Sequence, residues 1–274
     1  MAPALPPEGS RRLPRHRWPA ASGQAAEDLV AVEEPMGLRV QGADYAVLMR
    51  TPGRDEDLAC GFLAAEGVLA GPEDLGAVAP CVVEEGVAIN VALAPGVPFD
   101  GGRVQPRRVD SSCGLCGAHS IADLERMAPR ALPPAPERMD LEVLQRAFGA
   151  LRAGQELFAA TAGSHGAGLV DAEGRLLDLA EDVGRHNAVD KLLGACLRAG
   201  DYPLAGGAGL VVSGRLSYEL VQKAVLGGLA WLAGVGMPTT LAVEAAAATG
   251  RGLYGWVRDG GVSVYAGGTV FDGG

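Results

Sequence analysis

The chain has 274 residues, 33 acidic and 23 basic, and its net charge of −10 disfavours broad binding to nucleic acid or to anionic membranes. This length allows a full hydrophobic core, and five cysteines without a clear secretory signal favour a reducing cytoplasm over a disulfide-stabilised secreted protein. The longest apolar run, from Ala224, is interrupted by glycines and falls short of the ~20 residues that a membrane span needs. We therefore expect a cytoplasmic protein without a nucleic-acid or membrane partner.

Residues 1–26 differ in composition from the rest of the chain. Four arginines lie among prolines in this segment, and Glu8 is its only acid, so we expect a disordered basic arm. The pair Arg11-Arg12 is typical of a twin-arginine export signal, but the long apolar segment that such a signal requires does not follow it.

The segment 27–108 has the pattern of a β-rich unit. Three apolar or alternating runs have the length of strands and contain or adjoin turn signals: residues 29–35, 37–50 and 81–93. One helix is expected within this part, over residues 55–67, because acids occupy its first turn and a glycine ends it.

The remaining segment, 109–274, alternates strands and helices. Helices are expected over residues 118–127, 140–159 and 238–250 and from Asp182 onward, a strand, loop and helix over 208–228, and hairpins over 167–182 and 252–266. Residues 129–139 have the composition of a linker. The expected fold is therefore α/β, α+β overall, with the smaller β-rich portion at the N-terminus.

Two cysteines, Cys113 and Cys116, lie in a glycine-rich C-x-x-C segment that precedes a helix. A helix N-terminus favours the thiolate, which is the nucleophilic form of cysteine, and Arg107 and Arg108 could add to this effect. The glycines around the pair would allow a bulky partner to approach closely.

This cysteine pair could form one of three kinds of site: a zinc site, a redox pair or a sulfur carrier. Structural zinc needs two further ligands, but the sequence has no second C-x-x-C and His119 could supply only one ligand. A zinc deaminase is excluded because no histidine is followed by x-Glu and no proline precedes Cys113. A thioredoxin-type redox pair would open a helix after an early strand, without an arginine-rich approach. Composition alone does not separate that site from a sulfur carrier.

A second group of reactive side chains lies in residues 180–194. Acidic, imidazole, amide and amine groups recur here at intervals of four, which would place them on one exposed stripe of a helix: Asp182, His186, Asn187, Asp190 and Lys191. The alternative is an ordinary solvated face with helix ion pairs. The density of such groups at a helix start favours a site.

Two further segments carry weaker signals. Ser213, Gly214 and Arg215 lie where a buried strand is followed by a helix, a position at which α/β sheets bind ligands and where a helix N-terminus suits phosphate. His165 lies in a turn of small residues, where we expect a structural histidine without a ligand.

Taken in chain order, these segments resemble the formate dehydrogenase accessory sulfurtransferase (FdhD) family. The resemblance covers nearly everything after the arm and is carried by these motifs: "EEPMGLRVQG" (33–42), "MRTPGRDEDLACGFLAAEGV" (49–68), "SSCGLCG" (111–117), "AGSHGAGL" (162–169), "EDVGRHNAVDKLLG" (181–194), "SGRLSYELVQKA" (213–224), "PTTLAVEAA" (238–246) and "LYGWVRDGGVSVYA" (253–266).

The resemblance implies a sulfurtransferase with a cysteine persulfide intermediate. A cysteine desulfurase would pass sulfur to Cys113, with Cys116 assisting or relaying it, and the sulfur would then reach the molybdenum bis(molybdopterin guanine dinucleotide) cofactor of formate dehydrogenase. The family also implies a homodimer and no structural metal. The alternative is a non-catalytic chaperone that binds and delivers the cofactor, with structural or redox cysteines.

The resemblance also implies where the cofactor binds. Its contacts would lie in the C-terminal hairpin: Trp256, Val257, Arg258, Asp259, Gly260 and Gly261. A protein of net charge −10 must gather positive charge locally to hold phosphates, so we expect Arg185, Arg215 and Arg258 to line one pocket, with His186 beside them. The family is similar in fold to cytidine deaminases, which implies a deaminase-like core without zinc chemistry.

Overall fold

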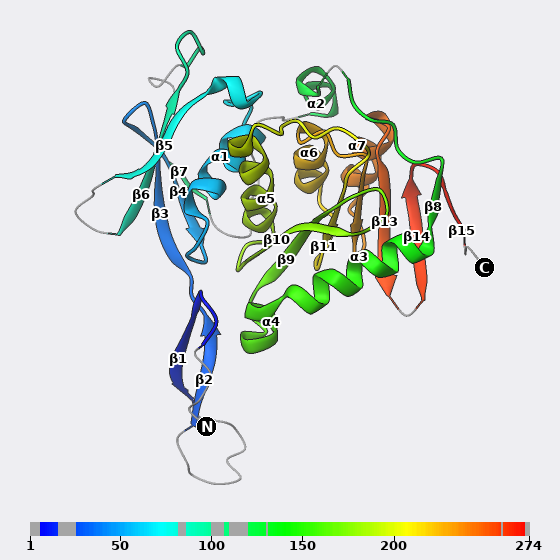
Figure 1. Cartoon of the computed structure of the whole chain (residues 1–274), viewed down its shortest axis with the longest axis horizontal. Helices are drawn as coiled ribbons and strands as arrows, with labels where there is room; N and C mark the ends of the chain where they lie inside the picture. Colours follow the sequence, from blue (N-terminus) through cyan, green and yellow to red (C-terminus); the bar gives the residue numbers. More distant parts are fainter. Residues whose placement is uncertain are drawn as a thin grey trace.

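The computed structural model describes residues 6–15, 26–81, 86–99, 107–109, 120–129, 131–258 and 260–271. Its two main sheets, of five and six strands, lie side by side with helices between them (Figure 1). The expected α+β class is confirmed. The absence of a membrane-spanning segment was also expected, and none of the helices in the described ranges is long and apolar enough to cross a membrane.

The N-terminal sheet has the order β5-β6-β3-β4-β7. Its strands are β3 (Glu34–Val40), β4 (Ala43–Arg50), β5 (Leu75–Cys81), β6 (Val87–Leu93) and β7 (Arg107–Val109), and the short helix η1 (Pro72–Asp74) precedes β5. Both residues of the β3–β4 turn, Gln41 and Gly42, have positive φ, which suits a tight hairpin. Helix α1 (Asp55–Ala65) carries three acids in its first turn, as expected from the sequence.

The six-stranded central sheet has the order β10-β9-β11-β12-β13-β14. Its strands are β9 (His165–Val170), β10 (Leu176–Asp182), β11 (Gly209–Val212), β12 (Trp231–Gly234), β13 (Gly252–Arg258) and β14 (Gly261–Ala266). Strands β11, β12 and β13 are parallel, whereas β9–β10 and β13–β14 form the two expected hairpins.

Helices cover both faces of the central sheet (Figure 1). The helices are α2 (Ile121–Met127), α3 (Leu141–Gly154), α4 (Glu156–Thr161), α5 (Arg185–Ala199), α6 (Tyr218–Leu226) and α7 (Thr240–Ala248). Along β11, Leu210 and Val212 pack into the cluster that contains α5 and α6, whereas Val211 packs into the cluster beneath α3. This alternation is what a strand buried on both faces requires.

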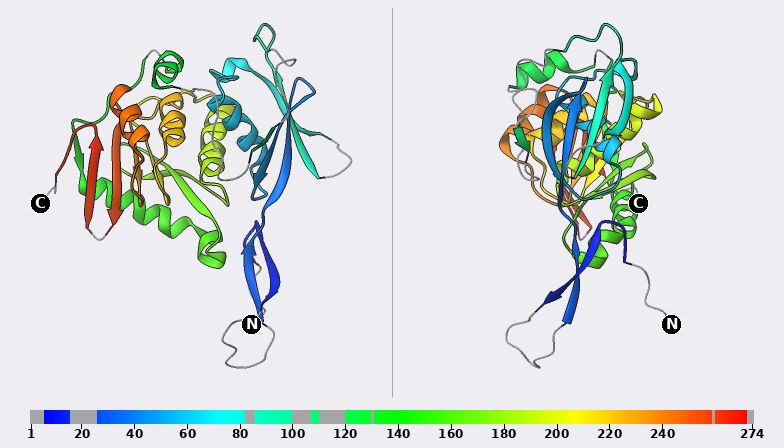
Figure 2. Two further views of the ribbon diagram at one scale, coloured as in Figure 1. Left: turned by 180° about the vertical axis from the view of Figure 1, so that it is seen from behind. Right: turned by 90° about the vertical axis from the view of Figure 1, so that its left-hand side faces the viewer.

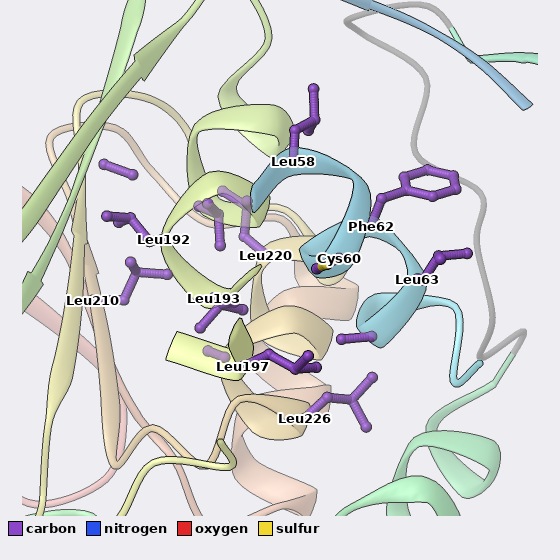
Figure 3. Close-up of a cluster of buried hydrophobic side chains, with 14 of the residues drawn as sticks. Leu58, Cys60, Phe62, Leu63, Leu192, Leu193, Leu197, Leu210, Leu220 and Leu226 are labelled. Atoms are coloured by element: carbon purple, nitrogen blue, oxygen red, sulfur yellow. The ribbon is translucent and has the colours of Figure 1, made fainter. Parts of the chain in front are cut away.

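The larger cluster joins the two sheets into one core. Leu58 and Phe62 of α1 belong to the same buried cluster as Leu193 and Leu197 of α5, and Figure 3 shows the two helices next to each other. The two helices cross closely because glycines, Gly61 on α1 and Gly194 on α5, lie at the crossing. A Cβ on Gly61 would lie 2.6 Å from the carbonyl carbon of Asp190 in α5.

Three expected elements differ in the structure. The single helix expected over 140–159 is divided at Gln155, which ends α3 and precedes α4. The helix expected from Asp182 begins at Arg185, because β10 extends to Asp182. The linker 129–139 ends in a short strand, β8 (Arg138–Asp140), which pairs with β15 (Thr269–Phe271).

The arm expected to be disordered is partly ordered. Residues 10–15 form β1 (Ser10–Arg15), which pairs antiparallel with β2 (Ala26–Ala31), so the expectation is wrong for these residues. The two strands pair over the whole length of β1, and two exposed ion pairs accompany the pairing: Arg15 lies 3.0 Å from Asp28, and Arg11 lies 3.0 Å from Glu34. Figure 2 shows this ribbon projecting from the rest of the molecule. Residues 1–5 and 16–25 lie outside the described part.

Candidate functional site

The candidate site lies at the edge of the central sheet where the parallel strands end. Ser213, Val235 and Val257 lie at or just past the carboxyl ends of β11, β12 and β13. His165 begins the antiparallel neighbour β9 and therefore reaches the same edge. Helices α5 and α6 begin near this edge, which is where open α/β sheets bind their ligands.

A cavity of about 870 Å³ opens at this edge, beneath α3 and α4. Its walls are mostly apolar, with a few polar side chains among them: Phe148, Leu151, Arg152, Gln155, Phe158, Ala162, Gly163, Ser164, His165, Ser213, Val235 and Val257. Its volume is that of a ligand site rather than a packing defect.

Two arginines, Arg185 and Arg215, lie near His165, which lines the cavity, and the buried Glu219 is the acid that faces Arg185. Within the described residues, the structure shows no hydrogen bond or ion pair for the guanidinium of Arg185 or of Arg215, and Nε of Arg185 is buried. Burial and then the nearby Arg215 lower the pKa of Arg185. Gly214 lies close to both His165 and Arg185, since a Cβ there would lie 3.5 Å from Nδ1 of His165 and 3.8 Å from Cδ of Arg185. Two cations placed together in an acidic protein can bind an anion.

His165 links the arginines to the cavity. Burial and the neighbouring Arg185 lower the pKa of its imidazole, so the ring is neutral at pH 7 and can donate one hydrogen bond and accept another. From the sequence alone we expected a structural turn histidine here, and its position beside the arginines is visible only in the fold.

His186 lies in the interior, and the exposed stripe expected for this face of α5 is wrong. Its Nε2 is 3.1 Å from Oε2 of Glu219 and 3.3 Å from Oγ of Ser217. Nζ of Lys223 lies 3.8 Å from Oε1 of the same Glu219 and 2.7 Å from Oδ1 of Asp190. Burial lowers the pKa of His186 to about 2 and raises the pKa of Asp190 to about 7. His186 is therefore neutral and adds no charge to the arginine pair.

The other polar residues expected on the exposed stripe, among them Asp182, Asn187 and Lys191, form contacts between the two sheets. Asp182 is fully buried and accepts hydrogen bonds from the backbone N–H of Thr51 at 3.0 Å and of Gly184 at 2.8 Å. Asn187 donates to the same carboxylate at 2.9 Å, and Nζ of Lys191 lies 2.8 Å from it and 2.9 Å from the Thr51 carbonyl oxygen. These contacts hold the end of β4 against the start of α5 and so fix the backbone that carries Arg185.

The C-terminal hairpin approaches the same edge. Trp256 has a φ of 57°, an uncommon value for a residue with a side chain, and the β13–β14 register shifts between Gly255 and Arg258. The backbone N–H of Trp256 donates to the carbonyl oxygen of Gly236 at 3.3 Å, and a Cβ on Gly236 would lie 3.0 Å from Cα of Arg215. Trp256 is exposed, and Val257 is buried against the cavity.

The rest of this hairpin is described in part. Gly260 has a positive φ, as a tight turn requires, and Gly261 pairs with Arg258. Asp259 and the side chain of Arg258 lie outside the described residues, so the convergence of Arg258 with the arginine pair stays a prediction.

Cys113 and Cys116 also lie outside the described residues, but the segments that flank them are placed. On one side, Val109 of β7 pairs with Leu48 of β4. On the other, the carbonyl oxygen of Ser120 accepts a hydrogen bond of 3.1 Å from the Tyr218 hydroxyl at the start of α6. The cysteine segment therefore follows the edge strand of the N-terminal sheet and precedes a residue that contacts the start of α6.

The three other cysteines do not suit a reactive role. Cys60 is fully buried in α1, and burial raises its pKa to about 12. Burial likewise raises the pKa of Cys196 to about 11. Cys81 is a free thiol that lies partly exposed on β5. Among the residues that the structure describes, no three metal-ligating side chains are grouped, and the absence of a structural metal stays a prediction because the C-x-x-C pair lies outside them.

Comparison with known proteins places the chain among relatives of similar length. Residues 31–271 match the sequence model of the FdhD/NarQ family. "Sulfur carrier protein FdhD" of Anaeromyxobacter dehalogenans is 44% identical over 265 residues and 90% of each chain, and that of Streptomyces coelicolor is 44% identical over 250 residues and 88% of each. The protein of the same name from Mycobacterium tuberculosis is 41% identical, covering 87% of this chain and 90% of its own.

The fold has a solved counterpart. A crystal structure from Desulfotalea psychrophila, described as that of a formate dehydrogenase accessory protein, superposes with a TM-score of 0.69 at 23% identity and covers 94% of this chain and 96% of its own. The cytidine-deaminase likeness stays a prediction. The resemblance first carried by short motifs thus extends over the two sheets and the arginine-lined edge, and the chain belongs to the FdhD/NarQ family.

Proposed function

We propose that this protein is a sulfur carrier that receives sulfur from a cysteine desulfurase and hands it to the molybdenum bis(molybdopterin guanine dinucleotide) cofactor of formate dehydrogenase. The observation that carries the proposal is that Arg185 and Arg215 lie together near an apolar cavity, while Ser120, which follows the cysteine segment in the chain, accepts a hydrogen bond from Tyr218 at the start of α6. The name of the curated relatives, sulfur carrier protein, supports the same role.

The loading step is a thiol exchange that is balanced in atoms and electrons. The Cys113 thiolate attacks the terminal sulfur of the desulfurase's cysteine persulfide, the S–S bond of that persulfide breaks, and the desulfurase cysteine leaves as its thiolate. The product is a persulfide on Cys113, with no net oxidation. Cys116 assists or relays the sulfur to the cargo. We also propose that the protein works in the cytoplasm as a homodimer, as the family resemblance implies.

The cargo fits the described residues. A dinucleotide carries a pyrophosphate, and Arg185 and Arg215 offer two cations for which no ion pair within 4 Å is seen in the described part of the chain, although the buried Glu219 lies near Arg185. The backbone N–H groups at the start of α5 add the positive end of a helix dipole. Since His186 is buried and neutral, we assign it the support of this helix start rather than a contact to phosphate.

Persulfide loading tests the proposal. After incubation with a cysteine desulfurase and cysteine, mass spectrometry is expected to find one added sulfur on Cys113 or Cys116, and Cys113→Ser is expected to abolish stable loading. Cys81→Ser is the matched control and should load as the wild type does. Sulfur confined to Cys60, Cys81 or Cys196 would refute the proposal. A protein that binds the cargo but never loads sulfur would instead be a delivery chaperone.

Removing either arginine is expected to weaken binding of guanosine diphosphate about tenfold or more, because each charge-assisted contact contributes about 1.5–3 kcal/mol. Isothermal titration calorimetry of Arg185→Ala and Arg215→Ala measures this, and Arg258→Ala tests the hairpin in the same way. Arg12→Ala, on the exposed β1 strand, removes the same charge far from the edge and should leave the affinity unchanged. Equal affinities in all four variants would place the phosphates elsewhere.

A further inference from the structure

Four ionisable side chains meet in the interior behind Arg185. Two lie on α5 and two on α6, and none is more than 7% exposed: His186, Asp190, Glu219 and Lys223. Glu219 is the middle member, because one of its carboxylate oxygens lies 3.1 Å from Nε2 of His186 and the other lies 3.8 Å from Nζ of Lys223. The same Nζ lies 2.7 Å from Asp190. We call these four residues the α5–α6 cluster.

The α5–α6 cluster contains two carboxyl groups but one amino group. If both carboxyl groups were ionised while His186 was neutral, the cluster would carry a net negative charge in the protein interior. An uncompensated buried charge is costly, and a carboxyl group in that position takes up a proton instead. The nearby Glu66, which follows α1, is a third acid and does not relieve the excess. The arrangement therefore indicates that the cluster holds one proton more than the same side chains would hold in water at pH 7.

The pKa shifts of the cluster have the directions that this count requires. Burial raises the pKa of Asp190 to about 7 and also raises the pKa of Glu219, while Lys223 opposes both shifts. Burial lowers the pKa of His186 to about 2, so the additional proton lies on the carboxyl pair rather than on the imidazole. Because Asp190 and Glu219 share one ammonium group, they titrate as a coupled pair.

Arg185 connects the cluster to the anion site. The ionisable groups that face the cluster come from several elements: Glu66 after α1, His165 of β9, Arg185 of α5 and Tyr202 after α5. Burial raises the pKa of Tyr202, so its hydroxyl stays neutral. The charge of Arg185 acts to lower the pKa of Glu219, against the larger effect of burial. An anion that pairs with Arg185 weakens this effect, and the affinity of Glu219 for a proton then rises.

We propose that binding of a phosphate group at Arg185 and Arg215 draws a proton from the solvent into the α5–α6 cluster, with Glu219 as the group that links the two. The inference rests on the proposed anion site and adds a dependence of its affinity on pH. Its sign follows from linkage: a ligand that raises the proton affinity of a carboxyl group binds more tightly where protons are available. The affinity for phosphate is therefore expected to fall as the pH rises through neutrality.

Isothermal titration calorimetry at pH 7.5 in two buffers of different ionisation enthalpy, PIPES and Tris, counts the protons taken up with guanosine diphosphate. The wild type is expected to take up about half a proton more than Glu219→Gln, in which a neutral amide replaces the protonated acid. Ionisation of the ligand itself is the same with both proteins and cancels in the difference. Glu244→Gln, exposed on α7, is the matched control and should match the wild type. Equal uptake by the wild type and Glu219→Gln would overturn the inference.

His165 needs a separate variant, because burial and Arg185 lower the pKa of its imidazole and a phosphate near Arg185 would raise it again. His165→Asn is expected to keep most of the proton uptake. Loss of the entire uptake in this variant would place the proton on His165 and refute the role of the cluster.

The pH profile of the affinity provides a second measurement. Between pH 6.5 and 8.5, the dissociation constant of guanosine diphosphate is expected to rise about threefold more for the wild type than for Glu219→Gln. Asp190→Asn fixes the other carboxyl group in a neutral form and is expected to flatten the profile in the same way, so the test does not depend on the folding of one variant. Profiles as steep as that of the wild type in both variants would contradict the coupling.

Failure of this coupling differs from failure of the proposed function. If guanosine diphosphate binds and Cys113 loads sulfur, but the wild type and Glu219→Gln take up equal numbers of protons, the coupling falls and the sulfur carrier stands. If the proton uptake differs but no persulfide forms, the sulfur-carrier proposal falls and the coupling stands. If neither guanosine diphosphate nor inorganic pyrophosphate binds, the anion site and the coupling fall together, whatever the result of sulfur loading.

Discussion

Replacing Lys191 with methionine is expected to lower the free energy of unfolding by about 3–5 kcal/mol, because it leaves the carboxylate of Asp182 buried without its cation. Urea denaturation followed by circular dichroism measures the change. The substitution also removes a hydrogen bond to the Thr51 carbonyl oxygen, so β4 loses a contact with α5. The loss is therefore expected to loosen the junction between the two sheets.

A surface pair provides the control for this experiment. Arg175 and Asp171 form an ion pair of 2.6 Å in which the arginine is largely exposed, and Arg175→Met is expected to cost less than about 1 kcal/mol. The double variant Asp182→Asn with Lys191→Met should recover part of the loss, since no buried charge remains. If Lys191→Met costs no more than Arg175→Met, the junction does not depend on this pair.

Replacing Gly61 with alanine is expected to destabilise the fold by about 3 kcal/mol or more, at the upper end of the range for overpacked sites. The added methyl group would overlap the backbone carbonyl group of Asp190. Because this carbonyl group belongs to the helix backbone, it can move away only if α1 and α5 separate. Gly194 faces the same crossing, where a Cβ would lie 2.6 Å from the backbone N of Gly61. Gly194→Ala is expected to have a similar effect.

A glycine-to-alanine substitution is expected to raise, rather than lower, the stability of the protein where the helix has space for a methyl group. Gly149 lies in α3, and nothing lies within 4 Å of a Cβ built on it. Gly149→Ala should therefore stabilise the protein by about 0.5–1 kcal/mol, through the higher helix propensity of alanine. Thermal and urea unfolding of both variants compare the two sites. A neutral Gly61→Ala would show that the helix crossing is looser than the structure has it.

Local patterns predicted the elements well, because their causes lie within a few residues. The acids of the first turn of α1 and the turn glycines of the hairpins are of this kind. The break at Gln155 was missed because Gly154 and Gln155 are compatible with a continuous helix, whereas in the fold the backbone N–H groups of Leu157 and Phe158, at the start of α4, donate to the carboxylate of Glu181 on β10. Tertiary contacts outweighed local propensity here.

The candidate site could be predicted in part. The position of Arg215 after a buried strand predicted a place at the sheet edge, where open α/β sheets bind their ligands, whereas Arg185 was expected in the same pocket because an acidic protein must gather positive charge locally to hold phosphates. The burial of Asp182 could not be predicted, because its partner Thr51 is 131 residues away in the sequence. A periodic pattern shows which residues share a face of a helix, but not whether another helix covers that face.

The shared core that Figure 3 shows has a consequence for exchanging parts between relatives. The surfaces of α1 and α5 fit only each other at the crossing. Each helix has a glycine, Gly61 on α1 and Gly194 on α5, where the backbone of the other helix passes. A chimera that takes its N-terminal sheet from one homologue and its central sheet from another must therefore inherit both glycines in the same register. The helix crossing therefore constrains such an exchange independently of the cysteine segment.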